Sequence, residues 1–363
     1  MNIIFGAGSN GLSFLNSTKL KINYFVDNDR NLWGKKFNSI KCISPTGLNT
    51  KKINKIIIAT PAIENVKSQL NLMKIDRKKI LISPELIENL NEFPKKNFLV
   101  TANGINGGIY KLNISQNRIK RVFTGSVRGI AKVKDNYVCA DENEGIIILN
   151  RDFKVIKKQK LDYMSNPHCI DFDQKNRIIY INITALDCIY KISYPSLKIL
   201  KKIHIFKKKL YDAHHINSIK YHDENLYLTM FSLKGIFRND IWNDGGIIKY
   251  NLKNGKKEII KKNLFQPHSI QIVSKILHVC NSMKFEVLLN LQKKIPFNGY
   301  ARGLLVKKDY ILVGMSKVRR LDRFQKFSKH ISQDAGVIFL NRHRNTSNFF
   351  KFPTSEIYDI IEA

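Results

Sequence analysis

Histidine and arginine recur at one kind of position along the C-terminal part of the chain. Each leads a short apolar strand, and the set consists of Arg128, His168, His215, His268 and Arg302. Imidazoles ligate Zn, Mn, Fe or Ni, and guanidinium groups grip carboxylates or phosphates through paired hydrogen bonds. We therefore predict one catalytic site made of these five residues, with His168, His215 and His268 as candidate ligands of a divalent metal.

Two chemistries stay open for this set. A metal beside a carboxylate would acidify the adjacent C–H bond for elimination or epimerisation, or would polarise a lactone carbonyl. Without a metal, the same imidazoles would only donate hydrogen bonds to a bound anion. His214, Asp141 and Asp212 are candidate general bases, although spacing singles out none of them.

Five residues so far apart can meet only if the elements that carry them repeat. Units of similar pattern start at residues 128, 168, 215, 268 and 302, at intervals of 40, 47, 53 and 34 residues. Each has an apolar strand, a polar turn, a second apolar strand and then a further strand. Four short strands in about forty residues are typical of propeller blades. We predict a β-propeller over residues 98–363 with six blades, and five or seven as the alternatives.

The first strand of a blade lines the central channel, so its leading residue faces the mouth. A partial unit from Phe98 is predicted to add Asn103 to the ring of leading residues. The C-terminal stretch "NFFKFPTSEIYDIIEA" is predicted to complete that same blade, which would remove exposed sheet edges. Residues 315–330, "MSKVRRLDRFQKFSKH", are predicted to form a basic insertion in the fifth blade, with a solvated loop as the favoured form and a lid or a contact for acidic partners as the alternatives.

The N-terminal residues 1–92 have a different pattern. Gly6, Gly8 and Gly11 form G-x-G-x-x-G between an apolar strand and a helix, and Asp27 ends the next strand. Such a turn presents backbone amides to a phosphate, and a carboxylate at that distance meets ribose hydroxyls. Alternating strands and helices predict a small Rossmann-like domain with a parallel sheet. Residues 93–97 are the predicted linker.

This N-terminal segment resembles the Rossmann-like modules encoded in surface-polysaccharide gene clusters. The resemblance implies that a nucleotide, a nucleotide-sugar or NAD(P) binds there. It assigns the contacts to Gly6, Gly8, Ser9, Asn10, Gly11 and Asp27. The alternative is a module that binds no ligand and serves in protein interaction.

Residues 98–363 are similar to an uncharacterised bacterial propeller family. The shared motifs are Pro267-His268-Ser269, Arg302-Gly303-Leu304, Val313-Gly314-Met315-Ser316-Lys317 and Glu356-Ile357-Tyr358-Asp359-Ile360. There is a looser likeness to propeller lactonases and lyases. Their acidic metal ligands have no match in this chain, which speaks against plain lactonase activity.

The charge of the chain is strongly positive, with 62 Lys and Arg against 29 Asp and Glu and a net charge of +33. Because the lysines are spread along the whole chain, nucleic-acid binding is not favoured, whereas any cleft would attract small anions. Association with a membrane surface stays open, but no stretch is long enough to span one. Five scattered cysteines predict neither disulfides nor a zinc site, and the expected location is the cytoplasm. The sequence makes no prediction of oligomeric state.

Together these features predict a two-domain protein of surface-glycan or nucleotide-sugar metabolism. Its propeller would act on an acidic sugar or nucleotide-sugar as a lyase, epimerase or hydrolase. The alternative is a non-catalytic propeller scaffold that recruits glycan-assembly enzymes.

Overall fold

The computed structural model of the chain describes residues 1–84, 86, 93–162, 164–206, 211–239, 242–324 and 330–363. Within them the chain divides into two units, Met1–Pro94 and Lys95–Ala363.

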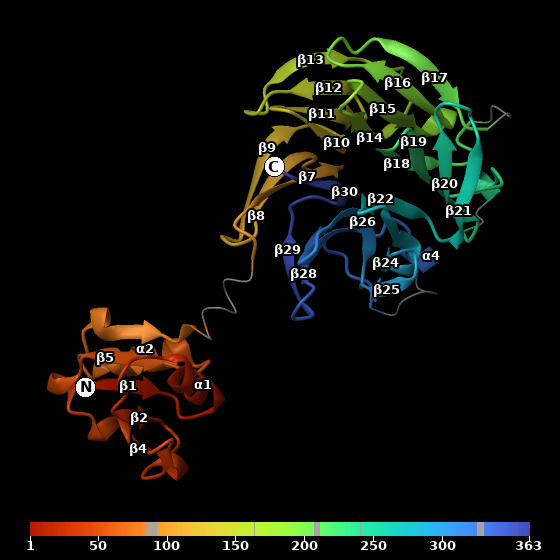
Figure 1. Cartoon of the computed structure of the whole chain (residues 1–363). Coiled ribbons are helices and arrows are strands. Elements are labelled where there is room, and N and C mark those ends of the chain that lie inside the picture. Colours follow the sequence, from red (N-terminus) through yellow and green to blue (C-terminus); the bar gives the residue numbers. More distant parts are fainter. Residues whose placement is uncertain (85, 87–92, 163, 207–210, 240–241, 325–329) are drawn as a thin grey trace. The chain divides into compact units, whose positions relative to one another are not determined.

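A mainly parallel sheet forms the N-terminal unit, with the strand order β3-β4-β2-β1-β5-β6 (Figure 1). The parallel strands are β1 (Asn2–Phe5), β2 (Tyr24–Val26), β4 (Ile40–Ile43), β5 (Lys55–Ile58) and β6 (Ile80–Ile82). Strand β3 (Lys36–Phe37) pairs antiparallel with β4 at one edge. The parallel strands follow the order of a Rossmann-type sheet, so the predicted fold of this unit is confirmed.

The central strands of this sheet are apolar on both faces because both faces are covered. Ile3, Ile56 and Ile58 pack with Val66 and Leu70 of helix α2 (Ile63–Leu72). On the other face, Ile4 and Ile57 pack with Phe14 of helix α1 (Ser9–Ser17). No helix in the described part of the chain has the length and apolarity that a bilayer crossing requires.

Six four-stranded antiparallel sheets form the second unit, which confirms the predicted six-bladed propeller (Figure 1). Each sheet is given from its innermost strand outward: β10 (Val127–Val133), β11 (Asn136–Asp141), β12 (Gly145–Leu149), β13 (Val155–Gln159); β14 (Pro167–Asp173), β15 (Ile178–Ile183), β16 (Cys188–Ser193), β17 (Ile199–His204); β18 (Ile216–His222), β19 (Asn225–Met230), β20 (Gly245–Asn251), β21 (Lys257–Leu264); β22 (Pro267–Val273), β23 (Ile276–Asn281), β24 (Glu286–Leu289), β25 (Lys293–Pro296); β26 (Tyr300–Val306), β27 (Tyr310–Ser316), β28 (Gly336–Asn341), β29 (Thr346–Lys351); and β30 (Glu356–Glu362), β7 (Asn97–Asn103), β8 (Gly108–Asn113), β9 (Arg118–Thr124).

The two ends of the propeller unit close the ring, as predicted. Strand β30 pairs antiparallel with β7, from Glu356 opposite Asn103 to Glu362 opposite Phe98. The C-terminal strand takes the innermost position, because β30 and not β7 lies between the inner strands β26 and β10. The prediction that Asn103 leads the split blade is therefore wrong, and the inner strand of that blade presents Glu356 and Tyr358 instead.

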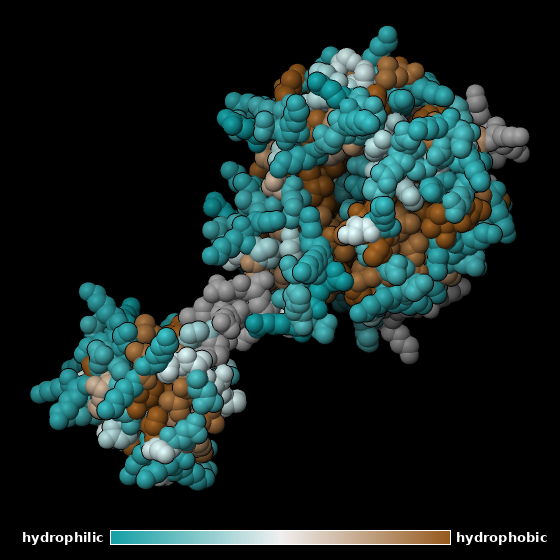
Figure 2. All heavy atoms as spheres, viewed as in Figure 1, coloured by the Kyte–Doolittle hydropathy of each residue, from teal (hydrophilic) through white to brown (hydrophobic). Residues whose placement is uncertain are grey.

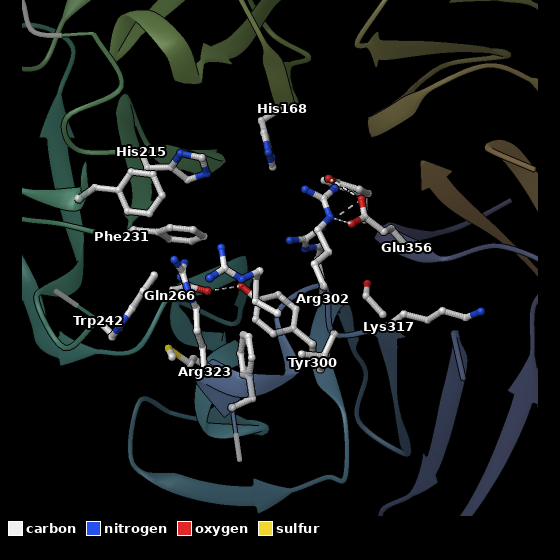
Figure 3. Close-up of a pocket in the computed structure, with 18 of the residues that line it drawn as sticks. His168, His215, Phe231, Trp242, Gln266, Tyr300, Arg302, Lys317, Arg323 and Glu356 are labelled. Atoms are coloured by element: carbon white, nitrogen blue, oxygen red, sulfur yellow. Dashed lines mark hydrogen bonds and ion pairs between the residues drawn. The ribbon is translucent and has the colours of Figure 1, made fainter. Parts of the chain in front are cut away.

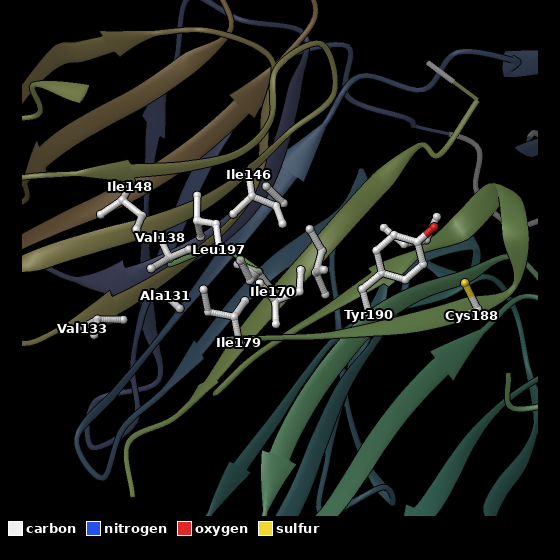
Figure 4. Close-up of a cluster of buried hydrophobic side chains, with 14 residues drawn as sticks. Ala131, Val133, Val138, Ile146, Ile148, Ile170, Ile179, Cys188, Tyr190 and Leu197 are labelled. Atoms are coloured by element: carbon white, nitrogen blue, oxygen red, sulfur yellow. The ribbon is translucent and has the colours of Figure 1, made fainter. Parts of the chain in front are cut away.

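Apolar side chains fill the space between neighbouring blades. Figure 4 shows one such cluster, in which Val138, Ile146 and Ile148 of the first sheet pack against Ile170 and Ile179 of the second. These side chains occupy alternate positions along their strands, and this period of two directs one side of every strand into each interface.

The outermost strand of every blade is an exposed sheet edge that carries lysine. Lysine on an edge strand opposes pairing with another chain, because its charge would have to be desolvated. Hydrophilic residues cover much of the visible surface in Figure 2. Part of the basic excess thus has a structural reason, in residues such as Lys120, Lys158, Lys202, Lys262, Lys294 and Lys351.

Ring closure generates a stability prediction at Ile360, a fully buried residue of β30. It lies against Gly303 of the neighbouring inner strand, where an added Cβ would come within 3.2 Å of Ile360 Cγ1. Ile360→Ala should lower the free energy of unfolding by about 2–5 kcal/mol, because it removes buried methyl groups and leaves a cavity. Chemical denaturation followed by circular dichroism measures this loss.

The matched control is Ile156→Ala, at a 56% exposed position on the outer strand β13. This change should stay within about 0.5 kcal/mol of the wild type. Equal effects of the two substitutions would contradict the role of β30 in closing the ring.

Candidate functional site

The inner strands surround a cavity of about 430 Å³ at one end of the propeller channel. All six blades contribute side chains to its lining, and Figure 3 shows ten of them labelled. Four of the five predicted site residues line it directly, namely Arg128, His168, His215 and Arg302. The fifth, His268, lines a smaller cavity in the channel that shares Arg128, His168 and Arg302 with the first. The structure thus brings all five together, while their catalytic role stays a prediction.

The lining of the larger cavity, called the mouth cavity below, is strongly basic. Glu356 is the one carboxylate among its described residues. A cleft lined by one sign of charge concentrates ions of the opposite sign. The cations are Arg128, Arg238, Arg302, Lys317, Arg319, Arg320 and Arg323.

Aromatic rings form a further large part of the wall. They offer flat apolar faces on which a sugar or another ring can lie, with polar groups left free for recognition. The guanidinium of Arg323 lies over the ring of Trp242, 4.8 Å from the ring centroid. The rings belong to Phe231, Phe237, Trp242, Tyr300, Phe324 and Tyr358.

Arg302 is held at the wall by two rings and a carboxylate. Its guanidinium carbon lies 4.4 Å from the ring of Tyr358 and 5.2 Å from that of Tyr300. Nη1 lies 3.8 Å from Oε2 of Glu356, which also pairs with Arg319. Burial opposes the charge of Arg302, but Tyr358 and Glu356 raise the pKa of its guanidinium, so it stays charged.

Glu356 is charged for the reciprocal reason. Burial alone would raise the pKa of its carboxyl, but Arg302 and Arg319 lower it below the ordinary value. Its Oε2 also accepts the hydroxyl of Tyr358 at 3.0 Å.

Arg128 is buried, with 7% of its side chain exposed. Its guanidinium donates to Asn166 Oδ1 and pairs with Glu142. Asn103 Nδ2 donates to the same Glu142 at 2.9 Å. Asn103 therefore helps to hold the carboxylate that pairs with Arg128. The atoms Arg128 Nε, Arg302 Nε and Arg302 Nη1 are buried and have no hydrogen-bond partner within the described chain.

His268 is 2% exposed and its tautomer follows from its partners. Nδ1 lies 3.0 Å from the backbone oxygen of Gln266 and 2.9 Å from Ser282 Oγ, whose own hydroxyl donates to Ala301 O. Both partners can only accept, so Nδ1 carries the proton and the neutral ring presents a lone pair at Nε2. Burial and the nearby Arg302 lower the pKa of His268 well below its ordinary value, so the ring stays neutral.

His215 is oriented by a carboxylate. Its Nδ1 lies 2.7 Å from Asp212 Oδ1, and Asp212 Oδ2 accepts from Arg238 at 2.6 Å. The rings of Phe231 and Phe237 lie 4.3 and 4.5 Å from the imidazole. A histidine oriented in this way by a carboxylate is suited to accept a proton at Nε2.

His168 lies between these groups. Its ring centroid is 5.9 Å from that of His215 and 5.3 Å from that of Tyr358. Burial lowers the pKa of His168 well below its ordinary value, and the positive charge of Arg128 acts in the same direction. His168 is therefore uncharged at neutral pH.

The described residues include no group of three or more His, Cys, Asp or Glu side chains positioned to hold a metal ion. Two of the three candidate ligands instead contact the same aromatic ring, since the ring centroid of Phe231 lies 4.3 Å from that of His215 and 5.0 Å from that of His268. The metal-binding role of His168, His215 and His268 stays a prediction without structural support.

Two of the three candidate general bases have structural roles. His214 stacks on Phe206 at 3.4 Å and hydrogen-bonds to the backbone oxygen of Ser232. Asp141 accepts the backbone amides of Ser126, Asn143 and Glu144 in a turn. Asp212 is the exception, because it contacts His215.

The N-terminal glycine turn forms as predicted, and packing explains two of its glycines. Gly6 has φ +113°, and a Cβ at Gly11 would lie 2.0 Å from the oxygen of Gly6. A Cβ at Gly8 would meet no atom within 4 Å, so this position is open, and Ser9 and Asn10 follow it in the first turn of α1. Asp27 Oδ2 accepts the backbone amide of Ala7, which ties the turn to β2. Nucleotide binding by these residues stays a prediction.

Sequence reasoning missed several residues of the mouth cavity. Phe231, Trp242 and Tyr358 lie outside the repeat position used for prediction. Basic residues of the 315–330 insertion line the cavity, with Arg323 in the short helix α4 (Leu321–Phe324). Residues 325–329 of that insertion lie outside the described part. The signal that could have found Tyr358 is its place in the terminal Glu-Ile-Tyr-Asp-Ile motif.

Fold and site define a class: a small Rossmann-like unit joined to a six-bladed propeller whose mouth is basic and aromatic. The chain belongs to the family described as Domain of unknown function (DUF4915), whose model matches residues 155–362. A second model, described as C2185-like, N-terminal, matches residues 2–81. No curated protein matches the chain.

Solved structures share the propeller fold at low sequence identity. One is a nidogen/laminin complex, with TM-score 0.55, 16% identity and coverage of 73% of this chain and 97% of that one. Another is a protein of unknown function from Bacteroides caccae, with TM-score 0.54, 11% identity and coverage of 74% and 99%. A protein from Lactobacillus plantarum has TM-score 0.50, 10% identity and coverage of 74% and 100%. At these identities the likeness shows the fold alone.

The buried neutral state of His268 generates a pH prediction. Below its ordinary pKa of 6.5 the unfolded chain binds a proton that the folded imidazole does not, so stability falls as pH falls. Between about pH 6.5 and about pH 5.5 the wild type should lose about 1 kcal/mol more than His268→Asn. Denaturation at a series of pH values measures the difference, in which the carboxylates common to both proteins cancel.

His343→Asn, which alters an exposed side chain, is the matched control and should follow the wild-type curve. Parallel curves for the wild type and His268→Asn would show that the folded imidazole protonates freely, and would contradict its burial as a neutral ring.

Proposed function

We propose that the propeller binds a small acidic sugar in the mouth cavity and transfers a proton at the carbon next to its carboxylate. One observation carries the proposal: three buried guanidinium nitrogens, on Arg128 and Arg302, lack hydrogen-bond partners in the described chain. Buried polar groups are normally paired, and a carboxylate is the group that arginine pairs with best.

The walls favour a carbohydrate over a bare inorganic anion. A cavity of about 430 Å³ is far larger than phosphate or sulfate needs and falls in the range used by small organic ligands. Aromatic faces such as Phe231 and Trp242 suit the apolar side of a sugar, while Gln266 and Tyr300 offer polar groups beside them.

The proton transfer is assigned to His215. Nδ1 donates to Asp212, so the opposite nitrogen is free to take a proton from the substrate carbon. The electron pair left on that carbon spreads into the carboxylate, where the charges of Arg128 and Arg302 stabilise it. Delivery of a proton from solvent to the opposite face of that carbon gives epimerisation, with the proton on His215 then lost to solvent. Loss of a leaving group from the neighbouring carbon gives elimination.

The alternative is a propeller that binds the acidic sugar without reaction, as a scaffold that recruits glycan-assembly enzymes. Both versions share the anion site and differ only in the use of His215. The wider role in surface-glycan or nucleotide-sugar metabolism rests on the resemblance of residues 1–92 and stays a prediction.

Binding is tested with two probes that differ in one group, D-gluconate and its neutral counterpart D-glucitol. Gluconate should bind at least about tenfold more tightly, because hydrogen bonds to a charged group are the stronger kind. Arg302→Lys should weaken gluconate about 10- to 100-fold, since lysine cannot form the paired contact. Isothermal titration calorimetry on the full chain gives these affinities.

Arg320→Gln tests the same site at an exposed lining residue, where folding is not at risk, and should weaken gluconate a few-fold. Arg151→Gln, at an exposed turn of the first blade, should bind as the wild type does. Equal affinity for gluconate and glucitol, or no binding of either, would overturn the proposed function.

Proton transfer is tested separately by exchange of the C2 hydrogen of D-gluconate in D2O, followed by proton NMR. The wild type should exchange it, and Asp212→Asn should slow the exchange by about 10²-fold or more while gluconate still binds. Asp135→Asn, which changes an exposed carboxylate in the turn between β10 and β11, is the control and should exchange at the wild-type rate. Tight binding without any exchange would favour the scaffold alternative.

A further inference from the structure

A second cavity of about 20 Å³ lies in the channel next to the mouth cavity. Arg128, His168, Arg302 and Tyr358 line both cavities, so the two cavities adjoin at these side chains. This inner cavity has room for one oxygen-sized group. Because His268 lines only the inner cavity, a group that enters there meets it directly.

Most polar side chains around the inner cavity already have partners within the protein. Ser218 Oγ accepts the amide of Ile270, Ser269 Oγ accepts the amide of Gly303, and Lys220 pairs with Asp171. Four buried atoms differ, since they have no hydrogen-bond partner among the described residues. They are Arg128 Nε, Arg302 Nε, Arg302 Nη1 and His268 Nε2.

These four atoms need different hydrogen-bond partners: some need an acceptor and one needs a donor. The three guanidinium nitrogens can only donate, so they need an acceptor. The Nε2 of His268 is a lone pair, because both partners of Nδ1 are acceptors, so Nε2 needs a donor. A carboxylate satisfies the arginines but cannot donate to Nε2. A hydroxyl does both.

We infer that the ligand is a 2-hydroxy carboxylate, with its carboxylate on Arg128 and Arg302 and its 2-hydroxyl in the inner cavity, donating to His268 Nε2. A hydroxyl on the adjacent carbon is the shortest arrangement that reaches both groups. Short reach is required, because Arg302 and His268 line the same cavity of only about 20 Å³. The inference rests on the proposed function, since it names the substrate class of the same site. His268 then determines specificity.

The test compares D-gluconate with 2-deoxy-D-gluconate, which keeps the carboxylate and lacks the 2-hydroxyl. The wild-type full chain should bind gluconate at least about tenfold more tightly, because the analogue leaves buried polar atoms unpaired. Calorimetry gives both affinities. Equal affinities would overturn the inference, and would assign the lone pair of His268 to a bound water instead.

Two variants of His268 distinguish the effect of losing the Nε2 acceptor from the effect of losing the folded structure. In His268→Asn the amide nitrogen can replace Nδ1 and keep the contacts to Gln266 and Ser282, while the Nε2 acceptor is lost. In His268→Gln the amide oxygen can replace Nε2. The Asn variant should bind both probes equally and the Gln variant should keep part of the preference for gluconate. A full preference in His268→Asn would overturn the inference.

The failures of the two proposals are distinguishable. If gluconate and its deoxy analogue bind equally but glucitol does not bind, the acidic-sugar site stands and the 2-hydroxyl assignment is overturned. If none of the three binds, both proposals are overturned. Binding of the deoxy analogue to His268→Asn also shows that this variant is folded.

Discussion

The pairing of β30 with β7 is the interaction on which the rest of the propeller depends. It joins residues more than two hundred positions apart, closes the ring and leaves no blade without its inner strand. The same strand carries Glu356 and Tyr358 to the wall of the mouth cavity, where they hold Arg302. Fold closure and site assembly are therefore one event, because a chain that lacks this pairing also lacks the groups that keep Arg302 in place.

Three arginines of the mouth cavity each pair with a carboxylate. Arg128 has Glu142, Arg302 has Glu356, and Arg238 has Asp212. Burial of a guanidinium without such a partner would be strongly unfavourable. The balance is incomplete at the hydrogen-bond level, since donors on Arg128 and Arg302 remain unpaired in the described chain. The ion pairs stabilise the buried charges in the absence of a ligand. The unpaired donors leave hydrogen bonds that a bound anion can complete.

The sequence pattern predicts the fold well because blades repeat and alternate. Spacing places Arg128, His168, His268 and Arg302 on inner strands and His215 beside one, and the ring then brings them together. Other features have no signal of this kind. Which end supplies the inner strand of the split blade depends on ring closure, so the sequence prediction for Asn103 is wrong. Phe231 and Trp242 lie outside the repeat, and the lone pair of His268 depends on contacts with Gln266 and Ser282 that only folding creates.

The central claim is that the unpaired atoms of Arg128, Arg302 and His268 converge on one anionic ligand. A crystal structure of the full chain grown with D-gluconate tests it most directly. The account predicts density for the sugar acid in the mouth cavity, with its carboxylate within hydrogen-bond distance of both guanidinium groups and an oxygen beside His268 Nε2. Gluconate bound elsewhere, with ordered water alone against these atoms, would contradict it.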